Sequence, residues 1–200
     1  MRKNNIAGLA LGAVLCAASL GTAFAQGAPP AAPAAPRPPF TLSSTAFSDG
    51  GVIPDTYTSN NTGKNISPPL SWVNAPAAAQ SFVLIVHDVD VALRRDIGDE
   101  LHWFAINIPA TAKGLPEGVP NTPTLPDGTI QPNNGGGTGT PFPGFMAPGA
   151  PAGKYHHYVF ELYALDTKLS LGADATREQV LAAMSGHVAG KAALTALFHR

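Results

Sequence analysis

The sequence predicts a mostly β domain, built as an antiparallel sandwich, from two observations. Three short runs rich in β-branched and aromatic residues stand at 81–86, 103–108 and 159–165. Turn-forming pairs such as Gly50-Gly51 and Pro68-Pro69 punctuate the chain around and between these runs. Short strands separated by such turns are typical of two packed antiparallel sheets.

The individual strands follow from alternation of apolar and polar residues. Residues 41–47 alternate in this way, so we expect a first strand there. Before and within the third run, Tyr158, Phe160 and Leu162 point one way and their neighbours the other, which indicates one buried face. A last strand or short extension covers residues 193–198.

One helix is expected near the end of the chain. Thr176 followed three residues later by Gln179 forms a capping-box pattern. An apolar stripe follows it: Val180, Leu181, Met184 and Val188. Gly186 and Gly190 interrupt the pattern, so the helix should end near Ser185 or His187, with His187 as a structural residue on it.

A long proline-rich segment lies between the second and third runs. Residues 113–151 contain the run 135–137 of three glycines and show no convincing period, so the conformation of 113–147 stays open. A loop of this length inside a compact domain is usually functional or mobile. A tolerated surface insertion is the alternative for its middle.

The first residues predict export. Arg2 and Lys3 precede an apolar stretch at 6–20 and a small-residue cleavage site at 23–25, which makes residues 1–25 a Sec-type signal peptide. We expect cleavage after Ala25, a periplasmic or secreted location, and no transmembrane anchor afterwards. The single cysteine, Cys16, leaves with the signal, so no disulfide is expected.

The mature chain divides into a linker and one domain. Residues 26–39 are Ala/Pro-rich and predict a disordered linker, and residues 40–200 form the domain. Ten basic and thirteen acidic residues remain after cleavage, a net charge of −3. No basic stripe interleaved with aromatic residues occurs, so no nucleic-acid partner is expected. A bound anion must therefore be held by a local site.

Two constellations at strand ends could build such a site. Asp88 and Asp90 close the first run and fall on one face by alternation, while His102 opens the second. A carboxylate that accepts from an imidazole N–H orients the ring towards an anion and stabilises its cationic form. Alternatively, both aspartates simply cap a turn.

The stretch 148–166 joins a Gly/Pro turn to His156, His157 and a strand. Such a turn lets backbone N–H groups approach a ligand, and a histidine on the adjoining strand adds a donor on a rigid scaffold. The alternative is an ordinary loop that enters a strand, with both histidines on a polar rim.

Enzyme signatures are missing from the sequence. It contains no nucleophile elbow, no cysteine nucleophile after cleavage, no P-loop and no zinc-type histidine spacing. We therefore expect no catalytic set, cofactor or metal, and favour binding over catalysis.

Together these motifs resemble the phosphatidylethanolamine-binding protein (PEBP) family, in its bacterial Raf-kinase-inhibitor-like branch. The resemblance covers residues 40–200. Beyond the stretch 148–166, its motifs are FSDGGVIP (47–54), NISPPLSW (65–72), SFVLIVHDVD (81–90), HWFAINIP (102–109), LPEGV (115–119) and GHVAGKAAL (186–194).

The resemblance implies a PEBP-like fold of two antiparallel β-sheets with one or two short helices near the C-terminus. It also implies a small pocket for phosphate-like anions, including the phosphatidylethanolamine headgroup. By motif position, its ligand-binding residues are Asp88, Asp90, His102, Ala147, Gly149, Pro151, His156 and Tyr158.

The chain departs from the family pattern near this pocket. His157 replaces a common arginine and weakens the permanent positive charge there, and Phe145 replaces a frequent tyrosine and removes a hydroxyl at the rim. We expect a weaker or more pH-dependent anion site.

Three functions stay open from sequence. We favour an exported binding protein for phosphate-like groups or phospholipid headgroups. The alternatives are an inhibitor of an extracytoplasmic protease or kinase-like partner, and a hydrolase of small phosphoesters. A protein target and a homodimer both stay open.

Overall fold

The computed structural model describes residues 37–62, 64–92, 98–137 and 139–200. The predicted signal peptide at 1–25 lies outside the described residues, as does all of the predicted linker except 37–39. Cleavage after Ala25 therefore stays a prediction.

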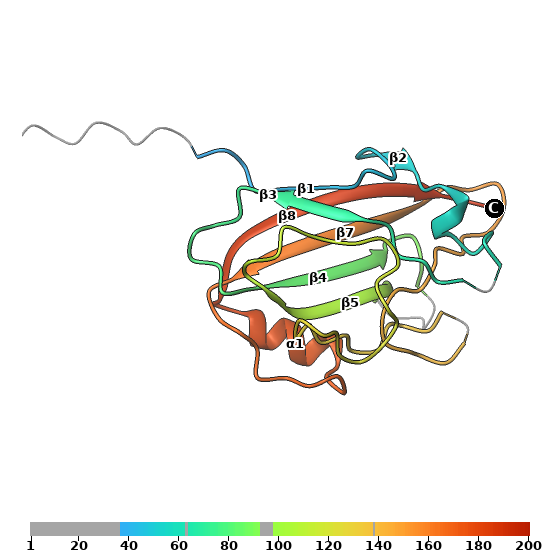
Figure 1. Ribbon diagram of the computed structural model, residues 1–200. Helices are drawn as coiled ribbons and strands as arrows, with labels where there is room; N and C mark the ends of the chain where they lie inside the picture. Colours follow the sequence, from blue (N-terminus) through green and yellow to red (C-terminus); the bar gives the residue numbers. More distant parts are fainter. Residues whose placement is uncertain (1–36, 63, 93–97, 138) are drawn as a thin grey trace, which may run out of the picture. The chain divides into compact units, whose positions relative to one another are not determined.

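Two β-sheets form the domain, as predicted (Figure 1). The smaller sheet is antiparallel and has the order β1 (Thr41–Ser43), β3 (Leu70–Val73), β6 (Gly114–Leu115). The larger has the order β2 (Gly51–Val52), β8 (Val188–Phe198), β7 (His156–Leu165), β4 (Ser81–Asp88), β5 (Glu100–Pro109). Its pairings are antiparallel except for the short parallel pair β2–β8.

The five-stranded sheet is covered on both faces, which explains why all eight residues of β4 are buried. Phe82, Leu84 and Val86 belong to the core shared with the three-stranded sheet. Val83 and Ile85 belong to a second cluster with the helix α1 (Arg177–Met184). Alternation therefore separates the two residues that end β4: Asp88 follows the first face and His87 the second.

Helix α1 confirms the predicted cap and corrects its stripe. The Thr176 hydroxyl accepts from the Gln179 N–H, and the Gln179 side chain accepts from the Thr176 N–H. The helix ends at Met184, as expected. However, Leu181 is exposed and Val188 begins β8, because the hydrogen-bonded turn at 184–187 starts the return to the sheet.

His187 is also displaced from its predicted place on the helix. It follows α1, and its Nδ1 lies 2.9 Å from Asp166 Oδ1, with both side chains half exposed. The described residues contain one α-helix, α1, and one 3-10 helix, η1 (Asp55–Tyr57). Of the one or two short helices expected near the C-terminus, α1 is therefore the one that is present, and η1 lies early in the chain.

Strand lengths differ from the sequence prediction where pairing, not pattern, decides them. β1 ends at Ser43 rather than at residue 47, although Phe47 still reaches the core and stacks obliquely on Phe160 with ring centroids 5.7 Å apart. β8 begins five residues before the predicted start at 193, because its whole length pairs with β7. β2, β3 and β6 were not predicted.

The long segment after β5 is held by buried polar contacts. The Gln131 side chain accepts from the Trp103 indole N–H at 2.7 Å and donates to the carbonyls of Pro120 and Thr122. These bonds satisfy the backbone of a segment that forms little regular structure.

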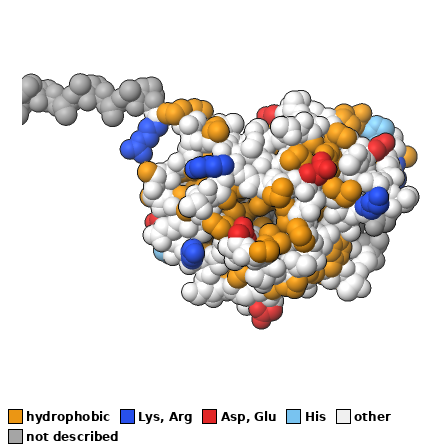
Figure 2. Space-filling view, viewed as in Figure 1, with side chains coloured by type: hydrophobic (Ala, Val, Ile, Leu, Met, Phe, Trp, Pro, Cys, Tyr) orange, Lys and Arg blue, Asp and Glu red, His pale blue; other side chains and the backbone are white. Residues whose placement is uncertain are grey.

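The surface carries few clustered charges on the face in view. Figure 2 shows Lys and Arg side chains scattered singly among apolar and uncharged atoms. Within the described part of the chain, no helix has the length and apolar character needed to cross a bilayer.

Candidate functional site

Seven of the eight predicted site residues line one cavity of about 380 Å³. It lies where β4 ends and where β5 and β7 begin. The seven are Asp88, His102, Ala147, Gly149, Pro151, His156 and Tyr158. The eighth, Asp90, does not line it.

Asp88 fixes the orientation of His156. The two residues end β4 and begin β7, and the antiparallel pairing of these strands brings them together. Asp88 Oδ2 lies 2.7 Å from His156 Nδ1, while Asp88 Oδ1 accepts from the Asp90 N–H at 2.9 Å. Asp88 thus both caps the turn and holds the imidazole, so the two alternatives considered from sequence are compatible. The other ring nitrogen of His156, Nε2, is left for a ligand.

His102 occupies a β-bulge. Val86 pairs with Trp103 and His87 with Leu101, so His102 is the extra residue in β5. The bulge lets it bond Met146 twice: the His102 carbonyl accepts from the Met146 N–H at 2.7 Å, and its Nδ1 lies 2.8 Å from the Met146 carbonyl.

That contact sets the tautomer and charge of His102. A carbonyl only accepts, so Nδ1 carries the proton and donates. Burial lowers the pKa of His102, more than the Met146 carbonyl and the Asp88 charge raise it. The ring is therefore neutral near pH 7, and Nε2 is a hydrogen-bond acceptor in the unliganded protein.

Tyr158 forms the wall beside His102. The two rings meet edge to face with centroids 5.0 Å apart, and the tyrosine is fully buried. Burial, followed by the charge of Asp88, raises the pKa of Tyr158. Its hydroxyl lies near Asp88 and the 149–150 backbone, but it makes no hydrogen bond of ordinary geometry to any described residue.

The turn that closes the cavity is anchored from two sides. The Ala147 N–H donates to the Asn65 side chain at 2.9 Å, and the Ser59 N–H donates to the Pro148 carbonyl at 2.8 Å. Such bonds preorganise the turn before a ligand arrives.

Gly149 keeps space open rather than permitting an unusual backbone. Its φ is not in the left-handed region, and a Cβ there would lie 3.6 Å from Arg200 Nη2 and 3.7 Å from Ser59 Oγ. A side chain would fill the gap between these two groups.

Three polar lining residues were not singled out from sequence: Ser59, Glu100 and Arg200. Glu100 is buried and accepts from the Gly137 N–H at 2.9 Å. It lies two residues before His102, a spacing that could have drawn attention to it. Arg200 and Ser59 carry no local signal, because only the pairing of β8 with β7 and the turn contacts bring them here.

Asp90 instead organises the start of β7. Its Oδ2 accepts from the His157 N–H at 2.7 Å and lies 2.9 Å from His157 Nδ1, and its Oδ1 lies 3.5 Å from Lys154 Nζ. The backbone and then the side-chain hydrogen bond from His157 lower the pKa of Asp90 to about 2.

Phe145 corrects the expectation of a change at the rim. It is 1% exposed and packs edge to face against Trp103, with centroids 5.7 Å apart. It belongs to the core, so the missing hydroxyl is not a rim group.

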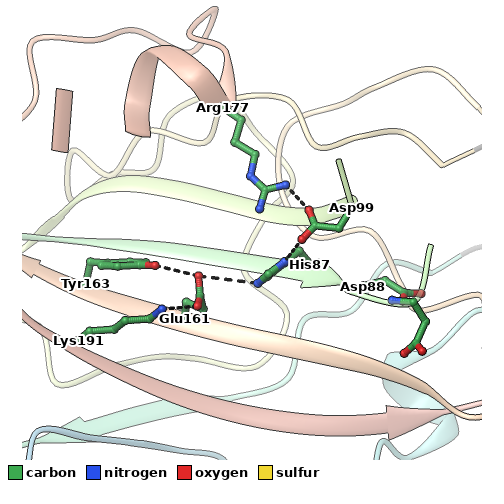
Figure 3. A network of polar contacts seen from close by, with 8 residues as sticks. His87, Asp88, Asp99, Glu161, Tyr163, Arg177 and Lys191 are labelled. Carbon is green, nitrogen blue, oxygen red and sulfur yellow. Dashed lines mark hydrogen bonds and ion pairs between the residues drawn. The ribbon is translucent and has the colours of Figure 1, made fainter. Parts of the chain in front are cut away.

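Behind the cavity, a chain of ionisable side chains crosses the other face of the sheet (Figure 3). Arg177 pairs with Asp99, which pairs with His87, and His87 Nε2 lies 3.7 Å from Glu161, which pairs with Lys191. Burial alone would raise the pKa values of both acids, but hydrogen bonds, including one from Tyr163 to Glu161, and the electrostatic effect of these partners together outweigh it and lower them. Figure 3 shows that the side chain of Asp88 points away from this network.

The cavity can hold an oxyanion through imidazole, hydroxyl, guanidinium and N–H groups, with carboxylates for a donor on the ligand. Among the described residues, no group of three or more His, Cys, Asp or Glu side chains is placed to hold a metal ion.

A β-sandwich with a preorganised polar cavity at the end of one sheet defines a class of small-ligand-binding domain. The chain belongs to the phosphatidylethanolamine-binding protein family, whose family model matches residues 43–199. Membership supports a ligand-binding protein in general and confirms the predicted fold.

Two relatives match over nearly their whole length. A UPF0098 protein of Methanothermobacter thermautotrophicus is 45% identical over 159 residues, which cover 80% of this chain and 98% of the relative. A UPF0098 protein of Chlamydia trachomatis is 38% identical over 161 residues, again 80% and 98% of the two chains.

Two crystal structures share the fold. A Chlamydia trachomatis protein, described as a PEBP homolog, superposes with a TM-score of 0.67 at 35% identity over 81% of this chain and 98% of its own. Escherichia coli YbcL, described as a member of the mammalian PEBP family, gives 0.66 at 26% identity over 80% and 98%.

Proposed function

We propose that this protein is an exported binding protein whose cavity holds a phosphate-like group, either free or as a phospholipid headgroup. One observation carries the proposal: residues from six separate stretches of the chain meet around one cavity, where the Asp88 carboxylate holds His156 in a fixed orientation. A charge-assisted pair of this kind suits recognition of an anion.

The dimensions and the unused groups support the same ligand class. About 380 Å³ lies at the small end of the range for ligand pockets and accommodates a phosphorylated headgroup, not its acyl chains. The buried Tyr158 hydroxyl has no protein partner of good geometry, and an oxygen of the ligand would supply one.

Calorimetric titration with inorganic phosphate and O-phosphorylethanolamine tests the proposal, with ethanolamine as the ligand that lacks phosphate. We expect both phosphates to bind and ethanolamine not to bind. His156→Ala should abolish binding. His187→Ala is the matched control, because it removes an exposed imidazole paired with Asp166 near the opposite end of β7. Wild-type protein that binds neither phosphate would refute the proposal.

Export is tested separately, because it rests on residues 1–25 alone. Expression of the full chain in a Gram-negative host, followed by fractionation and N-terminal sequencing, should give a periplasmic protein beginning at Gln26. An uncleaved chain in the cytoplasm would contradict it.

A further inference from the structure

The charges that line the cavity do not by themselves favour an anion. Asp88 and Glu100 contribute two carboxylates, His156 is engaged by Asp88, and His102 is neutral near pH 7 with an acceptor at Nε2. Among the described residues that line the cavity, only Arg200 carries a permanent positive charge. An anion therefore needs Arg200 to offset the carboxylates.

Arg200 is placed to serve this purpose. Its Nη2 lies 3.6 Å from the position of a Cβ on Gly149, and Ser59 Oγ lies 3.7 Å from the same point. Arg200 Nε donates to Ser59 Oγ at 3.4 Å, which positions the guanidinium over the turn that closes the cavity. The guanidinium, the hydroxyl and the open side of Gly149 thus meet in one small region.

Within the part of the chain that the structure describes, most N–H donors of the Arg200 guanidinium have no protein acceptor. Ser59 is its one side-chain acceptor among the described residues, and no ion pair joins it to a carboxylate of those residues. Arg177, by contrast, is paired with Asp99. The Nη1 and Nη2 groups of Arg200 form the edge that binds two oxygens of one phosphate in parallel.

We propose that Arg200 is the anchoring cation of this pocket and that Ser59 positions it, so the ligand is an oxyanion with at least two free oxygens on one phosphorus. This inference rests on the proposed function. It adds the residue whose positive charge lets an anion bind despite the two carboxylates of the cavity, Asp88 and Glu100. Phosphate esters in solution and phospholipid headgroups share this chemistry.

Titration of Arg200→Gln with inorganic phosphate and O-phosphorylethanolamine tests the proposal. We expect binding about tenfold to a hundredfold weaker than wild type, as for loss of a hydrogen-bonded charge. Arg200→Lys keeps the charge but not the paired donors, so its phosphate affinity should lie between those of wild type and Arg200→Gln. Lys168→Gln is the matched control, because it removes one exposed cation beyond the far end of β7.

Two further readouts keep the inference falsifiable. Arg200 is exposed, so Arg200→Gln should have the same melting temperature as wild type. Its weaker phosphate affinity should also depend less on salt concentration than that of wild type. If Arg200→Gln binds phosphate as tightly as wild type, the inference fails while the proposed function stands. If wild type binds no phosphate, both fail.

Vesicles of phosphatidylethanolamine in phosphatidylcholine distinguish the two sources of ligand. Binding that increases with phosphatidylethanolamine and is lost in Arg200→Gln supports a lipid headgroup. Arg200-dependent binding of the soluble phosphates alone supports a free phosphate ester. Vesicle and phosphate binding that are both unchanged in Arg200→Gln would refute the role of Arg200.

Discussion

Anion binding should draw a proton onto His102. In the empty cavity the Nδ1–H of His102 donates to the Met146 carbonyl, and Nε2 presents a lone pair. An anion oxygen repels that lone pair and attracts an N–H, so binding raises the pKa of His102 from its lowered value. Affinity should therefore be highest at acid pH and fall as pH rises.

The magnitude follows from linkage. Between the pKa of His102 in the empty protein, which lies below 6.5, and its higher pKa in the complex, one proton is taken up per anion. Affinity then falls by up to about tenfold per pH unit, or about 1.4 kcal/mol. Below the first pKa and above the second, the dependence disappears.

Sulfate is the probe for this measurement, because its own charge does not change between pH 5 and 8. Calorimetry in two buffers of different ionisation enthalpy gives the proton uptake directly. Wild type should approach one proton per sulfate near neutral pH, and His102→Gln should show a flat profile with none. Sulfate binding without proton uptake, or uptake that persists in His102→Gln, would refute this reasoning about His102.

Four further results are expected. Asp88→Asn should weaken phosphate binding about tenfold in calorimetry, whereas Asp90→Asn should leave it unchanged because Asp90 does not line the cavity. The depressed pKa of Asp90, about 2, means that its stabilisation is full above the unfolded value of 3.8 and disappears as pH falls through 2. Acid unfolding of Asp90→Asn should lack that component, and matching acid curves would contradict it. Gly149→Ala should shift the free energy of unfolding by less than about 0.5 kcal/mol yet weaken binding several-fold, since its methyl group occupies ligand space; unchanged affinity would contradict this. Asn107→Ala should lose about 1–3 kcal/mol in urea unfolding, because Asn107 holds a φ of 57° and two bonds to the Leu169 backbone, and Asn107→Gly should lose less.

Local sequence pattern was sufficient to predict three long neighbouring strands of the larger sheet and the helix α1. β4, β5 and β7 are long apolar or alternating runs, and α1 carries its cap in the sequence. β3 and β6 are only four and two residues long and lie beside prolines or glycine, so their strand character comes from pairing with each other and with β1. β8 contains four alanines and one glycine among its eleven residues, and neither residue type favours a strand by itself.

The site residues likewise fall into those that local motifs indicate and those that only the pairing of distant segments brings to the cavity. Asp88, His102 and His156 stand at strand ends, where sequence motifs could indicate them. The bulge that turns His102 towards Met146 could not be read from the chain, because it depends on the register between two strands. His157 was expected to leave the pocket short of fixed positive charge, but the structure brings Arg200 to the cavity from the other end of the domain sequence.

The chain of ionisable side chains on one face of the five-stranded sheet has a consequence for the cavity on the other face. The chain of contacts runs across neighbouring strands of the sheet: it begins at Lys191 on β8 and continues through Glu161 on β7 and His87 on β4 to Asp99, just before β5. Arg177 joins it to α1 (Figure 3). These contacts therefore link four neighbouring strands to one another and to the helix. His87 and Asp99 immediately precede the cavity residues Asp88 and Glu100 in the sequence. The ion pairs on the opposite face of the sheet thus hold the width of the cavity opening, although none of the paired groups contacts a ligand in the cavity.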